Sequence, residues 1–254
     1  MLTWIIPKRN ILYTTLLEGM TDVHAHLLPN VDGGAESLMD SMAALDRMRE
    51  VGVKRIFLTP HIAEECTNNS LELLQAKYSI LKECCPADIE LCLAAEYMLD
   101  NGFDARKRGK VLTFPGKQIL VETSRLSAPE KFLTFLFDLM LEGYRPVIAH
   151  PELYQYMTQD DYYFLKDKGY KFQLNLFSLA GLYGKQARSV ARILLNKEYY
   201  DYVGSDFHRL ADYEKGLKKL YLSGSQMKQI YKLFNNNDSL WNSGSVGRTK
   251  NLKL

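Results

Sequence analysis

The sequence predicts an α/β protein in which seven strand–helix units follow one another and close into a barrel. Three observations lead to this prediction. Short apolar runs of strand length alternate with longer segments of helical periodicity. The chain has 254 residues, close to the usual size of such a barrel, about 250 residues. Histidines and carboxylates stand at or just past the ends of these runs, and a barrel of this kind builds its site at the carboxyl ends of its strands.

The first half of the chain begins with a strand over Thr21–His26 and a helix over Ser37–Val51. Apolar residues recur at helical spacing in this helix, and Gly52 ends it. The elements expected next are a strand over Arg55–Leu58, a helix over Leu71–Glu83, a strand over Glu90–Glu96, a short extra strand over Val111–Phe114 and a strand over Gln118–Glu122.

The second half continues the same alternation. A proline in the first turn marks the start of a helix over Pro129–Glu142, which Gly143 closes. The elements expected next are a strand over Arg145–Ala149, a helix over Asp160–Lys168, a strand over Phe172–Leu176, a helix over Gln186–Asn196, a strand over Tyr202–Gly204 and a helix around Gln226–Leu233. Repeated β-α units imply a parallel sheet with right-handed crossovers.

We expect a single domain with two short flanks. Residues 1–19 form a leader that packs on the domain, residues 20–234 form the barrel, and residues 235–254 form a mobile tail. The apolar stretch Ile11–Leu17 of the leader is too short to span a bilayer, which needs about 20 apolar residues. No small-residue cleavage site follows it, and no other segment approaches membrane-spanning length.

Composition and charge narrow the class of protein. Hydrophobic residues make up 46% of the chain, enough for a sizeable core, and the net charge of +2 favours neither nucleic acid nor a membrane surface. The four cysteines show no C-x-x-C spacing and make a poor disulfide framework, so we expect a reducing, cytoplasmic setting. The oligomeric state stays open.

All five histidines can be placed in one site. Side chains on a strand alternate between faces, so His24 and His26 present two imidazoles to the same side. Asp22 shares that face, and we expect it to orient one of the imidazoles. The other three histidines follow further apolar runs: His61, His150 and His208.

Carboxylates follow similar strands. Glu96 and Glu122 each end an apolar run, and Asp206 stands two residues before His208. A buried carboxylate is costly unless it is paired or bound to a cation. Each residue alone could be an ordinary strand end or a satisfied core histidine, but together they form the donor set of a divalent metal cluster. The predicted metal ligands are His24, His26, His61, Glu96, Glu122, His150, Asp206 and His208.

These residues lie in motifs that resemble a known family. The motifs are D-V-H-A-H-L-L-P-N-V-D-G-G-A, T-P-H, A-A-E-Y, L-V-E-T, A-H-P-E and G-S-D-F-H, from about Met20 to His208. They are similar to those of the PHP (polymerase and histidinol phosphatase) phosphoesterases. The L-P-x-V-D-G-G-A and A-H-P-E blocks favour one branch of that family, the bacterial manganese-dependent protein tyrosine phosphatases associated with capsule and exopolysaccharide biosynthesis.

The resemblance implies a distorted (β/α)7 TIM-like barrel of the PHP type with up to three metal ions. It implies that one ion is bound by His24, His26, Glu96 and Asp206, that Glu96 bridges to a second ion bound by Glu122 and His150, and that His61 and His208 hold a third. Two to three divalent ions are therefore expected. Manganese is favoured, and iron or zinc is possible, because the ligands mix oxygen with nitrogen.

The chain departs from the family pattern at three positions. Gly33 stands where the family has an aspartate ligand of the third metal, so Asp32 or water would have to substitute. Leu153 and Tyr213 stand where the family has phosphate-binding arginines, and Arg209 is the nearest replacement for the second of these.

The implied activity is hydrolysis of a phosphomonoester by a metal-activated water, with a phosphotyrosine protein as the substrate. His150 and His208 are candidates for protonating the leaving group, and Arg209 for binding phosphate. The family suggests a tyrosine kinase tail as the phosphorylated partner. Two alternatives stay open: a regulatory metal-binding relative with weakened catalysis, and a phosphatase for a small molecule such as histidinol phosphate.

Overall fold

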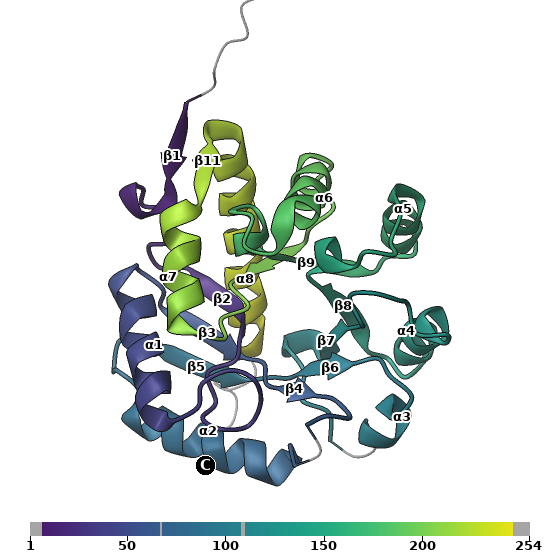
Figure 1. Cartoon of the computed structure of the whole chain (residues 1–254). Coiled ribbons are helices and arrows are strands. Elements are labelled where there is room, and N and C mark those ends of the chain that lie inside the picture. Colours follow the sequence, from purple (N-terminus) through teal and green to yellow (C-terminus); the bar gives the residue numbers. More distant parts are fainter. Residues whose placement is uncertain (1–6, 67, 108–109, 246–254) are drawn as a thin grey trace, which may run out of the picture.

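Two parallel β-sheets surrounded by helices form the body of the molecule (Figure 1). The computed structural model describes residues 7–66, 68–107 and 110–245. A three-stranded sheet has the order β2-β3-β5, and a six-stranded sheet has the order β10-β9-β8-β7-β6-β4. The strands are β2 (Thr21–Ala25), β3 (Arg55–Leu58), β4 (His61–Ile62), β5 (Glu90–Leu93), β6 (Glu96–Met98), β7 (Gln118–Glu122), β8 (Arg145–Ala149), β9 (Lys171–Asn175) and β10 (Tyr202–Gly204).

Helices follow most of the strands, as the alternating pattern predicts. They are α1 (Leu38–Glu50), α2 (Leu71–Cys84), α3 (Phe103–Arg106), α4 (Phe132–Leu141), α5 (Gln159–Asp167), α6 (Gly184–Asn196), α7 (Leu210–Lys219) and α8 (Gly224–Ser245). Polar side chains define several starts. Ser37 caps α1 and Ser70 caps α2, and each accepts a hydrogen bond from a backbone N–H of the first turn. Thr158 and Asp161 form a reciprocal capping box at the start of α5.

The two sheets are connected at both of their edges. At one edge the backbone N–H of Asp206 donates to the His24 carbonyl (2.9 Å), and that of His26 donates to the Phe207 carbonyl (2.8 Å). At the other edge the chain runs from β3 into β4 and from β5 into β6 without a helix between them. The pairing shows two parallel sheets, whereas the sequence predicted one closed barrel. The expected strand Glu90–Glu96 is divided between them.

The central strands are buried on both faces. All five residues of β7 and the last four of β8 are buried, so their sequences read as nearly continuous apolar runs. Such a strand places its terminal polar residues at the edge of an apolar core, which is where the candidate ligands lie.

Some predictions of secondary structure are wrong. Val111–Phe114 forms no strand, because only Phe114 pairs, through an isolated antiparallel bridge to Gln118. Helix α4 begins at Phe132 rather than Pro129, since a turn closed by a bond from the Phe132 N–H to the Pro129 carbonyl precedes it. Helix α7 and the antiparallel pair β1 (Lys8–Asn10) and β11 (Tyr221–Ser223) were not expected.

The leader lies against the domain where the structure describes it, while residues 1–6 lie outside the described ranges. Ile11 and Leu17 are buried, and the Asn10 side-chain amide donates to the Leu217 carbonyl of α7 (2.9 Å). Among the described helices, none combines the length and the apolar character that crossing a bilayer requires.

The prediction of a mobile tail is wrong for residues 235–245, because they continue helix α8. Residues 246–254 lie outside the described ranges. Asn237 is fully buried. Its amide donates to the carbonyls of Thr21 and Val203 and accepts from the Val203 N–H. The Asn-Asn-Asn-Asp run is typical of a loop, yet here it supplies hydrogen bonds to two strands. Tertiary contacts therefore outweigh local propensity.

Candidate metal centre

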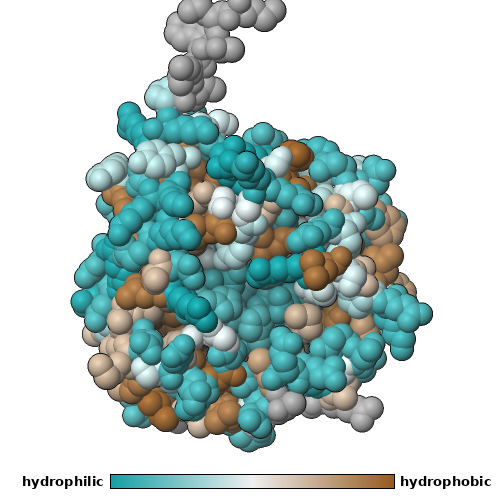
Figure 2. Space-filling model, in the orientation of Figure 1, coloured by the Kyte–Doolittle hydropathy of each residue, from teal (hydrophilic) through white to brown (hydrophobic). Residues whose placement is uncertain are grey.

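The structure brings all eight predicted ligand side chains together at one end of the strands. His24 lies on β2, with His26 just past its end, and His61, Glu96 and Glu122 lie on β4, β6 and β7. His150 follows β8, and Asp206 and His208 follow β10. Hydrophilic side chains gather around the hollow on this face of the molecule (Figure 2). Residues spread over most of the chain therefore share one site.

Glu96 lies at the centre of the cluster and is fully buried. Its Oε2 is 3.1 Å from Nε2 of His24 and 3.3 Å from Nδ1 of His61. Its Oε1 is 3.1 Å from Nε2 of His150. One carboxylate thus faces imidazoles from three different strands, with each oxygen directed at a different part of the cluster.

The H-x-H pair points into the same space. The Nε2 atoms of His24 and His26 are 3.0 Å apart, and Oδ1 of Asp206 is 3.5 Å from each of them. Two imidazole nitrogens and two carboxylates directed at one point are the donors that a divalent cation requires.

The remaining residues extend this cluster on two sides. Oε1 of Glu122 is 2.9 Å from Nδ1 of His61, and the His208 ring stacks on His26 with centroids 4.0 Å apart. Four sets of three ligand atoms lie within 4.8 Å of one another: His26, His61 and His208; His24, His26 and Asp206; His24, Glu96 and His150; His61, Glu96 and Glu122.

The outer nitrogens of the H-x-H pair are held by side chains that sequence reasoning did not assign to this role. Nδ1 of His24 pairs with Oε1 of Gln173 and Nδ1 of His26 with Oδ2 of Asp32, both at 2.9 Å. Such partners fix the orientation of a metal-binding imidazole. A buried glutamine within the apolar run of β9 was the available signal for Gln173.

Asp22 does not orient an imidazole, so that expectation is wrong. Its Oδ1 accepts the backbone N–H of His24 (3.1 Å) and that of Ser205 (3.0 Å). Asp22 therefore ties β2 to the segment after β10. Its short side chain bonds to backbone N–H groups and not to the imidazole ring of His24.

The backbone around the cluster is strained. His150 and Asp206 have φ angles of 33° and 53°, in the left-handed region that is unfavourable for residues other than glycine. A Cβ atom at Gly34 would collide with the His26 carbonyl oxygen, so only glycine fits there. Strain of this kind collects at functional sites, where surrounding structure maintains it.

Burial and charge act together on the titration of the cluster. Burial disfavours a charged His24, but Glu96 and Asp206 outweigh it and raise the pKa of His24 to about 9. Asp32 and the cluster carboxylates likewise outweigh burial and raise the pKa of His26. Burial also opposes ionisation of Glu96 and Asp206, yet the surrounding histidines keep both pKa values well below the usual range. Both carboxylates are therefore ionised, and the positive charge of the neighbouring histidines balances their negative charge.

Gly33 leaves space where the family pattern has a ligand. A Cβ atom there would contact nothing within 4 Å. Both oxygens of the neighbouring Asp32 have partners, since one pairs with His26 and the other accepts the Gly34 N–H. Leu153 and Tyr213 are both buried.

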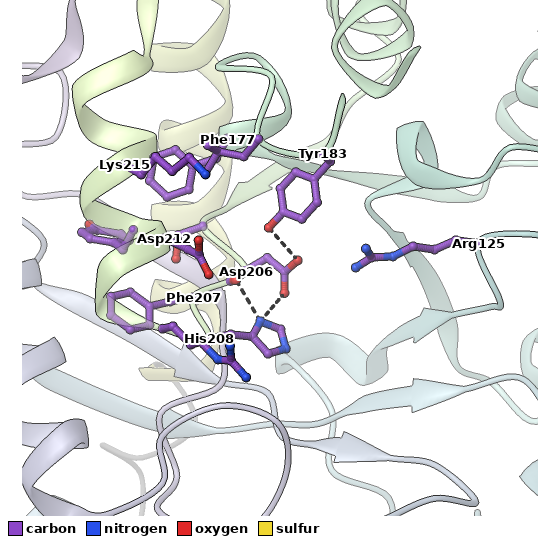
Figure 3. A pocket seen from close by; sticks show the side chains of 12 residues that line it. Arg125, Phe177, Tyr183, Asp206, Phe207, His208, Asp212 and Lys215 are labelled. Atoms are coloured by element: carbon purple, nitrogen blue, oxygen red, sulfur yellow. Dashed lines mark hydrogen bonds and ion pairs between the residues drawn. The ribbon is translucent and has the colours of Figure 1, made fainter. Parts of the chain in front are cut away.

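Arg209 lines a cavity of about 280 Å³ together with Asp206 and His208. The side chains of Asp206 and His208 lie next to one another in this cavity (Figure 3). Among the predicted ligands His208 is one of the more accessible, with 30% of its side chain exposed, whereas only 2% of the His150 side chain is exposed.

The sequence of the chain is similar to that of known proteins. A family model described as capsular polysaccharide synthesis, CpsB/CapC, matches residues 20–230. Tyrosine-protein phosphatase YwqE of Bacillus subtilis (strain 168) is 29% identical over 198 residues, 75% of this chain and 78% of that protein. Tyrosine-protein phosphatase CpsB of Streptococcus pneumoniae is 26% identical over 203 residues, 75% of this chain and 84% of that protein.

Solved structures show the same relationship. The chain is similar to one from the crystal structures of YwqE from Bacillus subtilis and CpsB from Streptococcus pneumoniae, described as unique metal-dependent tyrosine phosphatases. The TM-score is 0.75 at 26% identity, covering 88% of this chain and 95% of that one. An inactive dihydroorotase-like domain from Chaetomium thermophilum, 12% identical with a TM-score of 0.53, shares the fold alone.

Proposed function

This chain belongs to the capsular polysaccharide synthesis CpsB/CapC family, and we propose that it is a metal-dependent protein tyrosine phosphatase, a phosphoric monoester hydrolase. The observation that carries the proposal is the arrangement around Glu96, whose two oxygens each face an imidazole, Oε2 that of His24 and Oε1 that of His150. A carboxylate in that position suits a bridge between two cations. The two sheets would then act together as one distorted (β/α)7 barrel, whose strand ends hold the site.

The donor set fits two to three divalent ions. His24, His26 and Asp206 would hold one ion, with Glu96 shared with a second ion at Glu122 and His150. His61 and His208 would hold the third, where Gly33 supplies no donor. Manganese is our first choice because the ligands mix carboxylate oxygen with imidazole nitrogen. When bound, such ions supply a nucleophile from water at neutral pH and neutralise phosphoryl oxygens.

Residues of the chain would orient the ligands, bind the phosphoryl group and approach the leaving oxygen. Asp32 and Gln173 fix the ring orientations of the H-x-H pair. Arg209 lies at the cavity wall, where a guanidinium suits a phosphoryl group. His208 is exposed to the cavity and can approach a leaving oxygen when it does not hold the third ion, because a metal-bound imidazole is a poor acid. His150 is too enclosed to do so and is better suited to holding an ion.

Phosphotyrosine suits this site as a substrate. Its phenolate leaving group has a pKa of about 10, lower than that of an alcohol, and depends less on an acid. A phosphotyrosine protein, such as a tyrosine kinase tail, is the partner that we propose. We place the enzyme in the cytoplasm, where thiols such as its four free cysteines stay reduced.

The test is hydrolysis of a phosphotyrosine peptide by purified protein supplied with Mn²⁺, compared with histidinol phosphate. Turnover of the peptide that stops on chelation is expected, and Glu96→Gln should abolish it. Faster turnover of histidinol phosphate would assign a small-molecule substrate instead. A metal-loaded protein that hydrolyses no phosphomonoester would contradict the proposal.

A second candidate is a regulatory relative that binds metal with weakened catalysis. Gly33 favours it, because the site that includes His61 and His208 lacks a carboxylate there. Low turnover that rises at least tenfold in Gly33→Asp would support this candidate, whereas a high turnover unchanged by the substitution would exclude it.

A further inference from the structure

The cavity beside the cluster has a second arginine, contributed by a different loop. Arg125 comes three residues after Glu122, at the end of β7, and lines the cavity with His208 and Arg209. Its guanidinium points across the cavity toward Asp206 and His208 (Figure 3). The two arginines therefore line the same cavity.

The loop that carries Arg125 is held in place. Its carbonyl accepts the N–H of Gln155 (2.8 Å), and the N–H of Thr123 donates to the Tyr154 hydroxyl (3.2 Å). These bonds tie the loop after β7 to the segment that follows His150. Gln155, which bonds to Arg125, lies in this segment two residues beyond Leu153. Arg125 thus lies beside the segment where the family pattern has an arginine that this chain lacks.

The side chain of Arg125 is oriented by an aromatic ring and remains free to bind an anion. Its guanidinium carbon lies 5.6 Å from the centroid of the Tyr183 ring, and the Tyr183 hydroxyl donates to Oδ2 of Asp206 (3.4 Å). Within the described ranges it forms no ion pair, unlike Arg55 and Arg106, which pair with aspartates. A guanidinium that makes a cation–π contact with a ring keeps its planar set of N–H donors available to a phosphate.

We propose that Arg125 binds the phosphoryl group of the substrate and takes over the role of the arginine missing at Leu153. The proposal rests on the proposed function, since it concerns the same site. The bound oxoanion would lie between Arg125 and the cluster, with Tyr183 as the platform that fixes the guanidinium. This assigns a substrate-binding residue to the loop after β7, at a position outside the motifs described above.

The test measures binding of inorganic phosphate to the Mn²⁺-loaded protein by calorimetry, together with steady-state hydrolysis of a phosphotyrosine peptide. Arg125→Ala should weaken phosphate binding and lower kcat/KM by about 10- to 100-fold, the range for a lost charged hydrogen bond. Arg125→Lys should fall between, because lysine keeps the charge but loses the planar fork. Metal content should stay unchanged in both.

Arg145→Ala is the matched control. It removes the same charge from an exposed position at the opposite end of β8 and should change neither quantity. Equal phosphate affinity in Arg125→Ala and Arg145→Ala, or a wild-type protein that binds no phosphate, would overturn the assignment. If the wild type binds phosphate but hydrolyses no phosphomonoester, the proposed activity fails, and the phosphate titrations still decide the role of Arg125.

Discussion

The metal-free protein should lose stability as the pH rises from 6.5 to above 9. In the folded chain burial opposes the charge on His24, but Glu96 and Asp206 outweigh it and raise its pKa to about 9. The unfolded chain keeps the ordinary value of 6.5. Because the folded state binds the proton more tightly, this stabilisation is complete below pH 6.5 and disappears as the pH passes about 9.

The size of the effect follows from the shift. A pKa raised from 6.5 to about 9 corresponds to roughly 3 kcal/mol of folding free energy. The pKa values of His26 and His150 are also raised, since nearby carboxylates outweigh their burial, and these shifts add to the loss with the same sign. The lowered pKa values of Glu96 and Asp206 contribute stability that is lost only in acid, so they do not change across this range.

Urea unfolding of chelator-treated protein at pH 6.5 and pH 9.5, followed by circular dichroism, measures this loss. Glu96→Gln removes a carboxylate that faces His24, so its stability should depend less on pH. Metal-loaded protein should show no such loss, because its ligands have already given up their protons. Stability that is constant or rises with pH in the metal-free wild type would refute the reasoning.

Three further predictions concern the site and its support. Gly33→Asp places a carboxylate in open space and should raise the metal content per chain in elemental analysis; unchanged content would mean that the third site does not use this position. Asp32→Asn weakens the partner of His26 and should lower metal affinity by about 10- to 100-fold in calorimetry, whereas wild-type affinity would deny Asp32 an orienting role. Asn237→Leu removes buried hydrogen bonds to two strands and should cost about 2–3 kcal/mol in urea unfolding with unchanged activity per bound metal; a loss below 0.5 kcal/mol, on the order of a surface substitution, would contradict the structural role assigned to α8.

The elements that sequence reasoning located best are the buried strands whose carboxyl ends lie at the site. The runs that became β7 and β8 are apolar between their terminal residues, because parallel strands buried on both faces have no face exposed to water. Polar residues at the ends of such runs were recognisable as candidate ligands, since an isolated carboxylate or imidazole at the edge of a core is costly without a partner. Glu96, Glu122 and His150 are examples.

The elements that it missed depend on long-range contacts. Strands β1 and β11 are three residues each and pair with one another across most of the chain, so neither has a pattern of its own. The end of α8 has the composition of a loop and becomes ordered because Asn237 bonds to β2 and β10. Local propensity has no information about such partners.

The order of residues along the chain determined which donors this protein has, that strand ends carry them and that Gly33 supplies none. Tertiary structure decided which donors meet: Gln173 rather than Asp22 holds the His24 ring, Asp32 holds the His26 ring, and Arg125 reaches the cavity from another loop. The physical reason is that apolar periodicity is read within a few residues. Orientation of a buried polar group depends on which neighbour, often more than a hundred residues away, completes its hydrogen bonds.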